Sequence, residues 1–320
     1  MNILITGITG FVGSHMADYI LRNTDDKIFG IKRWMEDTKN IDHIIDNPNV
    51  TLIGGDLLDY ASIDRAVRIS KPDKVFHFAA QSFPETSFKN PVITLHTNVI
   101  GTTHLFESIK TNELDPVVVS VSSSEVYGMP KEDEIPIKED NPIRPANPYS
   151  ISKVGHDLMS QYYHKAYDMK IITTRMFSHE GARRGKEFAL SSFAYQIAKG
   201  EKNGNYEVKH GNLESIRTYN HIDDAIKAYW FCSEYGEQRY GEVYNIGGDE
   251  TCSVGEALDM LISKSDKPFK KVLDNNRIRP TDITLQIPCT IKFRNHFNWE
   301  PERNLNDICD DLLEYWRGIV

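Results

Sequence analysis

The stretch "NILITGITGFVGSHMADYILRN", from Asn2 to Asn23, decides the fold of this chain. Its first residues (2–6) are mostly apolar and predict a buried strand, and residues 13–23 carry Met, Ile and Leu at helical spacing. Between the two elements stand three glycines: Gly7, Gly10 and Gly13. One glycine in the tight turn, one where backbone approaches a pyrophosphate and one where helix packs on strand are typical of a dinucleotide-binding loop.

A plain strand-to-helix turn is the alternative interpretation of these glycines. The turn lies, however, at the start of a chain that goes on alternating strands and helices, and the binding motif requires that context. We therefore expect the loop and the first helical turn to contact a dinucleotide cofactor, through the three glycines and through Phe11 and Val12.

The rest of the chain repeats the order of strand and helix. Short runs rich in Val, Ile and Phe predict strands at residues 27–33, 50–55, 74–80, 116–123 and 170–177. Helical patterns lie between most of them, as at 60–70 and 91–110. Near-continuous apolar strands joined by amphipathic helices predict an α/β fold with a Rossmann-type, doubly wound parallel sheet covered on both faces.

The rhythm loosens beyond about residue 180, where helices dominate and strands are short, as at 242–248. We expect residues 1–180 to form the dinucleotide-binding domain with the catalytic residues. Residues 181–320 are expected to form a smaller C-terminal α/β lobe that mainly binds substrate. No linker or repeat separates the two parts, so the lobe is predicted to be interleaved with the first domain rather than independent.

Composition restricts the class of protein. The 320 residues are 40% hydrophobic and 26% charged, enough for a sizeable core, and 37 basic against 46 acidic residues give a net charge of −9. This balance argues against binding to nucleic acid or to an acidic membrane. The four cysteines form no CxxC pair and predict reduced thiols, with no metal site. The chain shows no signal-peptide pattern and no apolar run of membrane-spanning length, and we expect a cytoplasmic protein.

The end of the second predicted strand indicates which dinucleotide binds. Lys32 and Arg33 stand where proteins that prefer NAD usually carry an acidic residue for the ribose 2′-hydroxyl. Two cations at this position favour the 2′-phosphate of NADP over NAD. A solvated strand end remains the alternative, since lysine and arginine often occupy such positions.

Two further strand ends are candidates for cofactor contacts. Asp56 and Leu57 follow the third strand, where an aspartate can meet an adenine edge. Ala79 and Ala80 follow the fourth strand, and their small side chains would let the cofactor lie flat. Each pair alone is more often a turn or a packing choice, but both are in register with the glycine loop.

The segment "NPYSISK" contains a candidate catalytic pair, Tyr149 and Lys153, one turn apart on the same helix face. Pro148 suits the start of that helix. A tyrosine is a poor base at neutral pH, but a lysine ammonium one turn away and a positively charged nicotinamide would lower the pKa of its hydroxyl. The spacing alone also occurs on ordinary amphipathic helices.

The strand at 116–123 ends in hydroxyl groups and a carboxylate, in the run "VSVSSSEVYG". Ligands of doubly wound folds bind at the carboxyl edge of the sheet, so these groups would face the ligand. Ser123 could then bond a substrate hydroxyl, Glu125 could act as acid or base, and Tyr149 could take a proton. Alternatively, the serines cap a turn and Glu125 is a surface charge.

These motifs resemble those of a known family. "TGITGFVG", "FHFAAQS", "SSSEVYG", "YSISK" and "RPTD" occur in the order of the extended short-chain dehydrogenases/reductases. "GIKR", "NIDHI", "GDLLD", "FSHEGARRG" and "GNLESIR" most resemble the GDP-mannose 4,6-dehydratases. The resemblance implies a catalytic set of Ser123, Glu125, Tyr149 and Lys153. It also implies internal hydride transfer through NADP, oxidation at the sugar C4, proton abstraction at C5 by Glu125, and loss of water from C6.

The resemblance also implies a substrate site and an oligomer. We expect the GDP-sugar to meet residues of several motifs: Ser82, Ser124, Ser178, Arg217 and Arg279. The two arginines among them would bind the diphosphate. The loop with Arg183 and Arg184 reaches the cofactor site of a neighbouring subunit in related dehydratases, which implies a homodimer or homotetramer and adds Arg184 to the cofactor contacts. A surface salt bridge is the alternative for each arginine.

Several positions depart from the family pattern. Ser123 replaces the usual threonine, Ser178 an asparagine and Thr218 a frequent aspartate, and Ser124 stands where dTDP-glucose 4,6-dehydratases have an aspartate. Some GDP-4-keto-6-deoxymannose reductases also carry Ser-Ser-Glu before the tyrosine, and the substrate of a GDP-manno-heptose 4,6-dehydratase differs only beyond C6 of the sugar, so both activities remain alternatives. A non-catalytic dinucleotide-binding regulator is a remote third, since it would be expected to lack Tyr149, Lys153 or the Ser123 hydroxyl.

Overall fold

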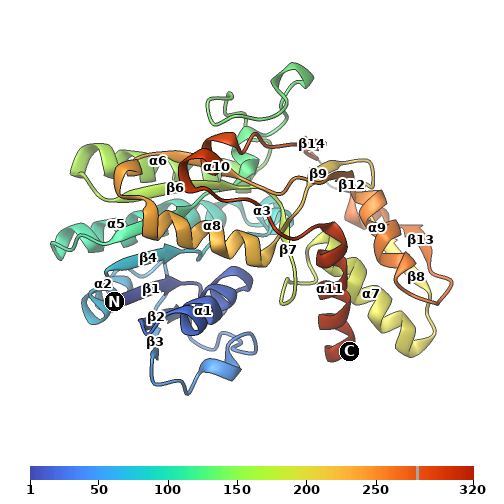
Figure 1. Cartoon of the computed structure of the whole chain (residues 1–320), viewed down its shortest axis with the longest axis horizontal. Helices are drawn as coiled ribbons and strands as arrows, with labels where there is room; N and C mark the ends of the chain where they lie inside the picture. Colours follow the sequence, from blue (N-terminus) through green and yellow to red (C-terminus); the bar gives the residue numbers. More distant parts are fainter. Residues whose placement is uncertain (279–280) are drawn as a thin grey trace. The chain divides into compact units, whose positions relative to one another are not determined.

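The computed structural model describes residues 1–278 and 281–320, and these residues contain a seven-stranded sheet (Figure 1). In chain order its strands are β1 (Asn2–Thr6), β2 (Lys27–Lys32), β3 (Val50–Gly54), β4 (Lys74–His77), β5 (Val117–Val121), β6 (Ile171–Met176) and β11 (Val243–Ile246). Their order across the sheet is β11-β6-β5-β4-β1-β2-β3. The paired strands run parallel, which confirms the predicted doubly wound fold.

Eleven α-helices are present in the described residues: α1 (Phe11–Asn23), α2 (Tyr60–Ser70), α3 (Pro84–Lys89), α4 (Pro91–Leu95), α5 (Gly101–Thr111), α6 (Pro148–Tyr167), α7 (Ala189–Asn203), α8 (Ile222–Tyr235), α9 (Val254–Ser263), α10 (Ile291–Phe297) and α11 (Leu305–Ile319). The helix predicted at 91–110 is divided, because the π-helical segment His96–Ile100 joins α4 to α5. The strand predicted at 74–80 ends at His77, where the chain leaves the ladder at the carboxyl edge of the sheet.

Helices cover both faces of the sheet. On one face, side chains of α2, α5 and α6 form a buried cluster with side chains of β1 to β6. The helices contribute, among others, Ile63, Phe106 and Tyr163. On the other face Trp230 of α8 stacks on Phe76 of β4, with ring centroids 6.2 Å apart, and meets Tyr19 of α1 at 5.6 Å. Burial of both faces explains why the strands are apolar along their whole length.

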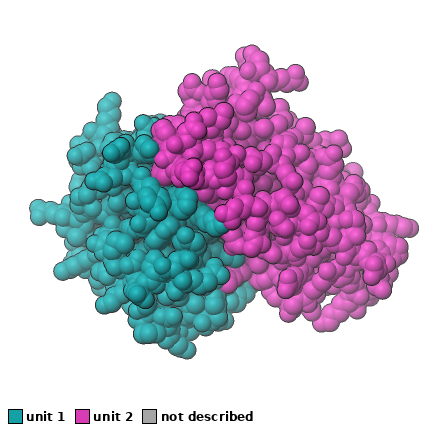
Figure 2. Space-filling model, viewed as in Figure 1, with its two compact units in different colours: residues 1–126, 147–175, 226–244 teal, residues 127–146, 176–225, 245–320 magenta. Residues whose placement is uncertain are grey.

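The chain forms two compact units, each built from three segments (Figure 2). Unit 1 comprises residues 1–126, 147–175 and 226–244, and unit 2 comprises residues 127–146, 176–225 and 245–320. The expected division of labour between residues 1–180 and 181–320 stays a prediction. No helix of the described residues combines the length and the apolar character that a membrane crossing requires.

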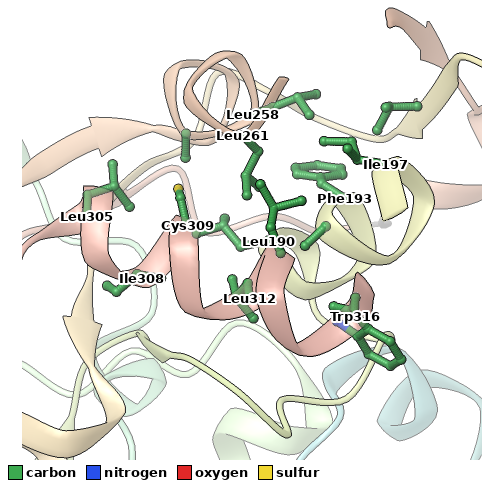
Figure 3. Close-up of a cluster of buried hydrophobic side chains, with 14 of the residues drawn as sticks. Leu190, Phe193, Ile197, Leu258, Leu261, Leu305, Ile308, Cys309, Leu312 and Trp316 are labelled. Atoms are coloured by element: carbon green, nitrogen blue, oxygen red, sulfur yellow. The ribbon is translucent and has the colours of Figure 1, made fainter. Parts of the chain in front are cut away.

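Unit 2 is organised around three helices, α7, α9 and α11 (Figure 3). Their buried side chains include Phe193, Leu261 and Leu312, and Asn304 caps α11 by accepting a hydrogen bond from the Asp307 amide. Short strands complete the unit: β7 (His179–Glu180), β8 (Glu207–His210), β9 (Ile216–Thr218), β10 (Asn220–His221), β12 (Thr251–Ser253), β13 (Lys270–Leu273) and β14 (Leu285–Gln286). They pair as β12-β9-β14, β13-β8 and β10-β7.

Candidate active site

The turn between β1 and α1 has room only for glycine at two positions. Gly7 has a φ of +73°, and a Cβ there would lie 3.0 Å from backbone atoms of Ala79. A Cβ on Gly13 would lie 2.2 Å from the carbonyl oxygen of Gly7. Any larger residue would push the helix away from the strand, so both glycines are required by this close approach.

The N-terminus of α1 is open to an anion. Gly10 is the N-cap in an extended conformation, and no side chain caps the helix. The backbone amides of the first turn of α1 are oriented along the helix axis, toward its N-terminal end. Together with the positive end of the helix dipole, this turn fits the pyrophosphate of a dinucleotide.

The candidate residues of four strands meet at one edge of the sheet. β2, β1, β4 and β5 are consecutive neighbours, so the residues that follow them lie side by side at their carboxyl ends. The chain order reverses between β1 and β4, which is the switch point where doubly wound folds bind ligands. Here the Ala79 amide donates to Thr6 Oγ1 at 3.1 Å. This bond ties the loop after β4, with Ala79 and Ala80, to the glycine turn.

The residues after β3 are held by local contacts. Asp56 Oδ1 accepts a hydrogen bond from the Leu58 amide at 2.9 Å, as in a tight turn. Leu57 is 6% exposed and packs in the core, where a Cβ on Gly101 would lie 2.6 Å from the Leu57 Cβ. The expected cofactor contacts of Asp56 and Leu57 stay predictions.

Arg33 has a partner that was not anticipated from the sequence. Its guanidinium donates to Glu36 Oε1 at 2.9 Å, and its backbone amide donates to Glu36 Oε2 at 3.0 Å. Burial works against ionisation of Glu36, but the bonds from Arg33, with a smaller effect from the Thr9 side chain, hold the pKa of the carboxyl below its usual value. Lys32 points its ammonium toward the Arg33 carbonyl at 3.4 Å. The sequence signal that could have indicated this ion pair is the acidic residue three positions after Arg33.

Lys153 connects α6 to the end of β5. Its ammonium donates to the carbonyl of Val121, the last residue of the strand, at 2.7 Å, and the residue is 4% exposed. Burial lowers the pKa of Lys153 to about 8, with the Asp157 charge acting in the opposite direction. Asp157 itself is paired with Arg175 at 2.9 Å. The lysine is thus fixed beside the polar end of β5 that begins at Ser122.

Glu125 is tied to the start of α6. Its Oε2 accepts a hydrogen bond from Asn147 Nδ2 at 2.9 Å, while Asn147 Oδ1 caps the helix by accepting from the Ser150 amide at 2.8 Å. The Glu125 amide donates to Ser123 Oγ at 3.2 Å. The Glu125 carboxylate is therefore bonded to Asn147, which precedes Tyr149 by two residues in the chain. Sequence reasoning missed Asn147, although an asparagine before Pro148 is a common helix-capping pattern.

Tyr149 is positioned through its backbone. Ser152 Oγ donates to the Tyr149 carbonyl at 2.6 Å and accepts from Asn98 Nδ2 at 2.8 Å. The same asparagine, in the π-helical segment, accepts from the Gln81 amide at 2.8 Å. The loop after β4 and the tyrosine are therefore held by one buried amide side chain, and π-helical turns often occur at such functional positions.

A row of buried polar side chains lies behind the site. Successive atoms are 2.8, 2.9, 3.0 and 2.8 Å apart in the order Thr6, His77, Thr102, His156 and Ser120. Burial, followed by the charge of Lys153, lowers the pKa of His77 to about 3 and holds that of His156 well below its usual value. Both rings are therefore neutral at neutral pH, and the row joins α6 to the sheet without adding a charge beside the lysine.

The expected substrate residues lie in both units. In unit 1, Ser124 is 4% exposed at the start of the turn after β5, whereas Ser82 is exposed. In unit 2, Ser178 accepts a hydrogen bond from the Asn220 amide through its carbonyl at 2.8 Å. Arg279 lies outside the described residues.

The arginines of unit 2 are held by contacts within that unit. Arg217 donates to the carbonyls of Ile216 and Ile283 and lies 3.9 Å from Asp282. Arg184 lies 3.6 Å from Glu180, and its guanidinium stacks over the Phe188 ring at 3.5 Å. Burial raises the pKa of Glu180 to about 7, and Arg184 acts against that rise. The binding roles expected for these arginines stay predictions.

The fold and the arrangement at this sheet edge define an extended short-chain dehydrogenase/reductase. UDP-glucuronic acid 4-epimerase of Bacillus cereus, in complex with UDP-glucuronic acid and NAD, has a TM-score of 0.90 to this chain at 25% identity, with 100% of each chain covered. RMD of Pseudomonas aeruginosa, complexed with NADPH, has the same fold, with a TM-score of 0.84 at 23% identity and 100% of each chain covered.

The sequence narrows this class to one family. The family model described as GDP-mannose 4,6 dehydratase matches residues 4–312. GDP-mannose 4,6 dehydratase 2 of Caenorhabditis elegans is 28% identical over 336 residues, which are 97% of this chain and 87% of the relative. The chain belongs to the GDP-mannose 4,6-dehydratase family, which confirms the resemblance drawn from its motifs.

Proposed function

We propose that this protein is a nucleotide-sugar 4,6-dehydratase, a hydro-lyase that converts GDP-mannose or a close GDP-sugar into the 4-keto-6-deoxy sugar. The observation that carries the proposal is the link between Glu125 and Asn147 at 2.9 Å, beside the Lys153–Val121 bond at 2.7 Å. A carboxylate is thereby held at the start of the helix that carries the Tyr149–Lys153 pair. A simple dehydrogenase needs only the pair, whereas elimination also needs a second acid–base group.

The cofactor is proposed to be a nicotinamide dinucleotide, and NADP in particular. The amides of the glycine turn would hold its pyrophosphate, and Lys32 with Arg33 would meet the 2′-phosphate. When bound, it supplies a hydride acceptor for the sugar C4 and returns the hydride to C6. The pocket wall beside it would be formed by Ala79 and Ala80, and Arg184 would reach a cofactor across a subunit contact.

Tyr149 is proposed to remove the proton from the sugar O4. The Lys153 ammonium, held by the Val121 carbonyl, stabilises the phenolate that this proton transfer requires. Ser123 bonds the same region of the sugar through its hydroxyl. Loss of this proton from O4, together with loss of the C4 hydride to the nicotinamide, would give a 4-keto sugar, whose C5 hydrogen is more acidic than in the starting sugar.

Glu125 is proposed to take the C5 proton. Its orientation comes from Asn147, whose side-chain amide donates a hydrogen bond to Glu125 Oε2 at 2.9 Å. The protonated carboxyl can then assist departure of the C6 hydroxyl as water. Ser82, Ser124 and Ser178 are proposed to bond the sugar, and Arg217 with Arg279 to bind the diphosphate. The subunits are proposed to associate through the Arg183–Arg184 loop as a dimer or tetramer.

Isotope transfer tests the proposed reaction directly. With GDP-mannose carrying deuterium at C4, we expect the product to carry deuterium at C6, and reaction in D₂O is expected to add deuterium at C5. The physical reason is that the hydride is returned within one turnover. Mass spectrometry and NMR of the product measure both positions.

Other distributions of the label would contradict the proposal. Deuterium released in free NADPH would identify a simple dehydrogenase. Consumption of NADPH with reduction of a 4-keto sugar would identify the reductase alternative. A GDP-heptose turned over much faster than GDP-mannose would identify the heptose dehydratase.

Replacement of Lys32 and Arg33 by alanine tests the cofactor proposal. We expect the affinity for NADP to fall about tenfold or more and the affinity for NAD to change little, since only NADP carries the charged 2′-phosphate. Calorimetric titration of both dinucleotides measures the two affinities. Equal losses for NADP and NAD would mean that these side chains do not read the 2′-phosphate.

The pH dependence of turnover tests the role of Lys153. Its pKa is lowered to about 8, so the ammonium is present below that pH and is lost as the pH rises through it. We expect kcat to fall above about pH 8, because the phenolate loses its cationic partner. In Lys153→Arg the guanidinium stays charged, so the alkaline fall should disappear while the maximal rate is lower. An unchanged alkaline limb in the variant would assign that limb to another group.

A further inference from the structure

We propose that Glu36 tunes the cofactor selectivity of this protein by competing with a 2′-phosphate for Arg33. This inference rests on the proposed dinucleotide site, but not on the proposed dehydration. No acidic residue directly follows β2, but Glu36, three residues after Arg33, folds back so that its carboxylate lies at the end of that strand. Arg33 is engaged by that carboxylate twice, through its guanidinium at 2.9 Å and its amide at 3.0 Å.

The turn that brings Glu36 back to Arg33 is fixed by several contacts. The Glu36 amide donates to the Arg33 carbonyl at 3.3 Å, and Met35 between them adopts a left-handed conformation with a φ of +57°. Thr9, in the glycine loop and 6% exposed, also lowers the pKa of Glu36 through its side chain. Asn40 Nδ2 also donates to the Thr9 carbonyl at 3.0 Å. The segment after β2 is thus attached to the dinucleotide-binding turn itself.

The exposure of the charges shows which of them is anchored. The Glu36 side chain is 24% exposed, whereas that of Arg33 is 65% exposed. The carboxylate is therefore the fixed member of the pair and the guanidinium is the outer one. Burial works against ionisation of Glu36, but Arg33, with a smaller effect from Thr9, holds its pKa below the usual value, so the carboxylate remains charged at neutral pH.

This arrangement acts differently on the two dinucleotides. The charge of Arg33 is largely compensated by Glu36, so of the two cations at the end of β2 only Lys32 is left without a carboxylate partner in the described residues. A 2′-phosphate must compete with Glu36 for the guanidinium and is repelled by its carboxylate. A 2′-hydroxyl is neutral and can donate a hydrogen bond to a carboxylate. Glu36 should therefore narrow the preference for NADP over NAD.

Glu36→Gln tests the inference by binding alone. The dissociation constants of NADP and NAD are measured by calorimetric titration of the full chain. The glutamine keeps an oxygen to accept from the Arg33 amide but loses the charge. We expect the ratio of the NAD to the NADP dissociation constant to rise about tenfold, a change of about 1.4 kcal/mol, through tighter NADP binding. The rise should shrink at high salt, since exposed charges are screened.

The adjacent acid provides a matched control. Asp37 is 67% exposed and pairs with Lys39 at 3.3 Å, so Asp37→Asn removes the same charge one residue away and should leave the ratio unchanged. In an Arg33→Ala background, Glu36→Gln should raise the ratio clearly less than it does when Arg33 is present, because the competition for the guanidinium is gone and only the direct effects of the carboxylate remain. An unchanged ratio in Glu36→Gln would overturn the inference. So would an equal rise in Asp37→Asn, or a full rise without Arg33.

The outcome is separable from that of the proposed function. A chain that gains NADP selectivity in Glu36→Gln but releases no water from any GDP-sugar would support the selectivity role and overturn the dehydratase. A chain that releases water from a GDP-sugar, but whose cofactor selectivity is unchanged in Glu36→Gln, would support the dehydratase and overturn the selectivity role.

Discussion

Tyr149→Phe is expected to lower kcat by about three orders of magnitude, since loss of a positioned acid–base group costs on the order of 10²–10⁴-fold. The ring stays and only the hydroxyl is removed, so the 8% exposed side chain keeps its packing. The defect should lie in the first half-reaction. Single-turnover absorbance of the reduced cofactor should therefore show no oxidation of the sugar, while GDP-sugar binding is retained.

A second tyrosine of α6 provides the control. Tyr162 is 51% exposed, and its hydroxyl lies 3.4 Å from that of Tyr167, so Tyr162→Phe removes an equivalent group from the same helix. We expect wild-type rates for that variant. Normal hydride transfer in Tyr149→Phe would remove Tyr149 from the mechanism.

Glu125→Gln is expected to stop elimination and to spare oxidation. Glutamine can still accept the Asn147 hydrogen bond, so the fold and the position of the side chain should survive. It cannot take a proton from C5, and we expect overall turnover to fall about 10²–10³-fold. Unlike in the tyrosine variant, reduced cofactor and the 4-keto sugar should accumulate in rapid-quench experiments, with GDP-sugar affinity nearly unchanged.

Glu132→Gln is the matched change for this experiment, because Glu132 is an exposed acid in the segment after β5. It should release water at the wild-type rate. If Glu125→Gln also did so, the carboxylate at 125 would have no part in C5 proton abstraction, and the argument from its bond to Asn147 would fail.

Local sequence patterns predicted the elements that depend on near neighbours. The strand at 2–6 and the helix at 60–70 have the predicted bounds, because alternating burial and helical spacing are properties of short segments. The predicted element bounds were wrong where contacts with distant parts of the chain change the local structure. β4 stops at His77, and the helix expected at 91–110 contains a π-helical segment in which Asn98 reaches Gln81 and Ser152.

The charged groups of the candidate site show the same limit. The sequence predicted two cations at the end of β2, but not the turn that brings Glu36 back to Arg33. It placed Glu125 after β5, but not its contact with Asn147. Hydrogen-bond partners across loops depend on the path of the backbone, and a pattern of residue types does not encode that path.

The sequence by itself determined the doubly wound fold, the glycine turn, the one-turn spacing of Tyr149 and Lys153, and the family. Each follows from short-range periodicity or from motifs in fixed order. Tertiary structure alone decided that Lys153 bonds Val121 and that its pKa falls to about 8. It alone also decided that the buried histidines stay neutral and that Glu36 engages Arg33. The physical reason is that ionisation and selectivity depend on burial and on charges brought together from distant positions, which exist only once the chain has folded.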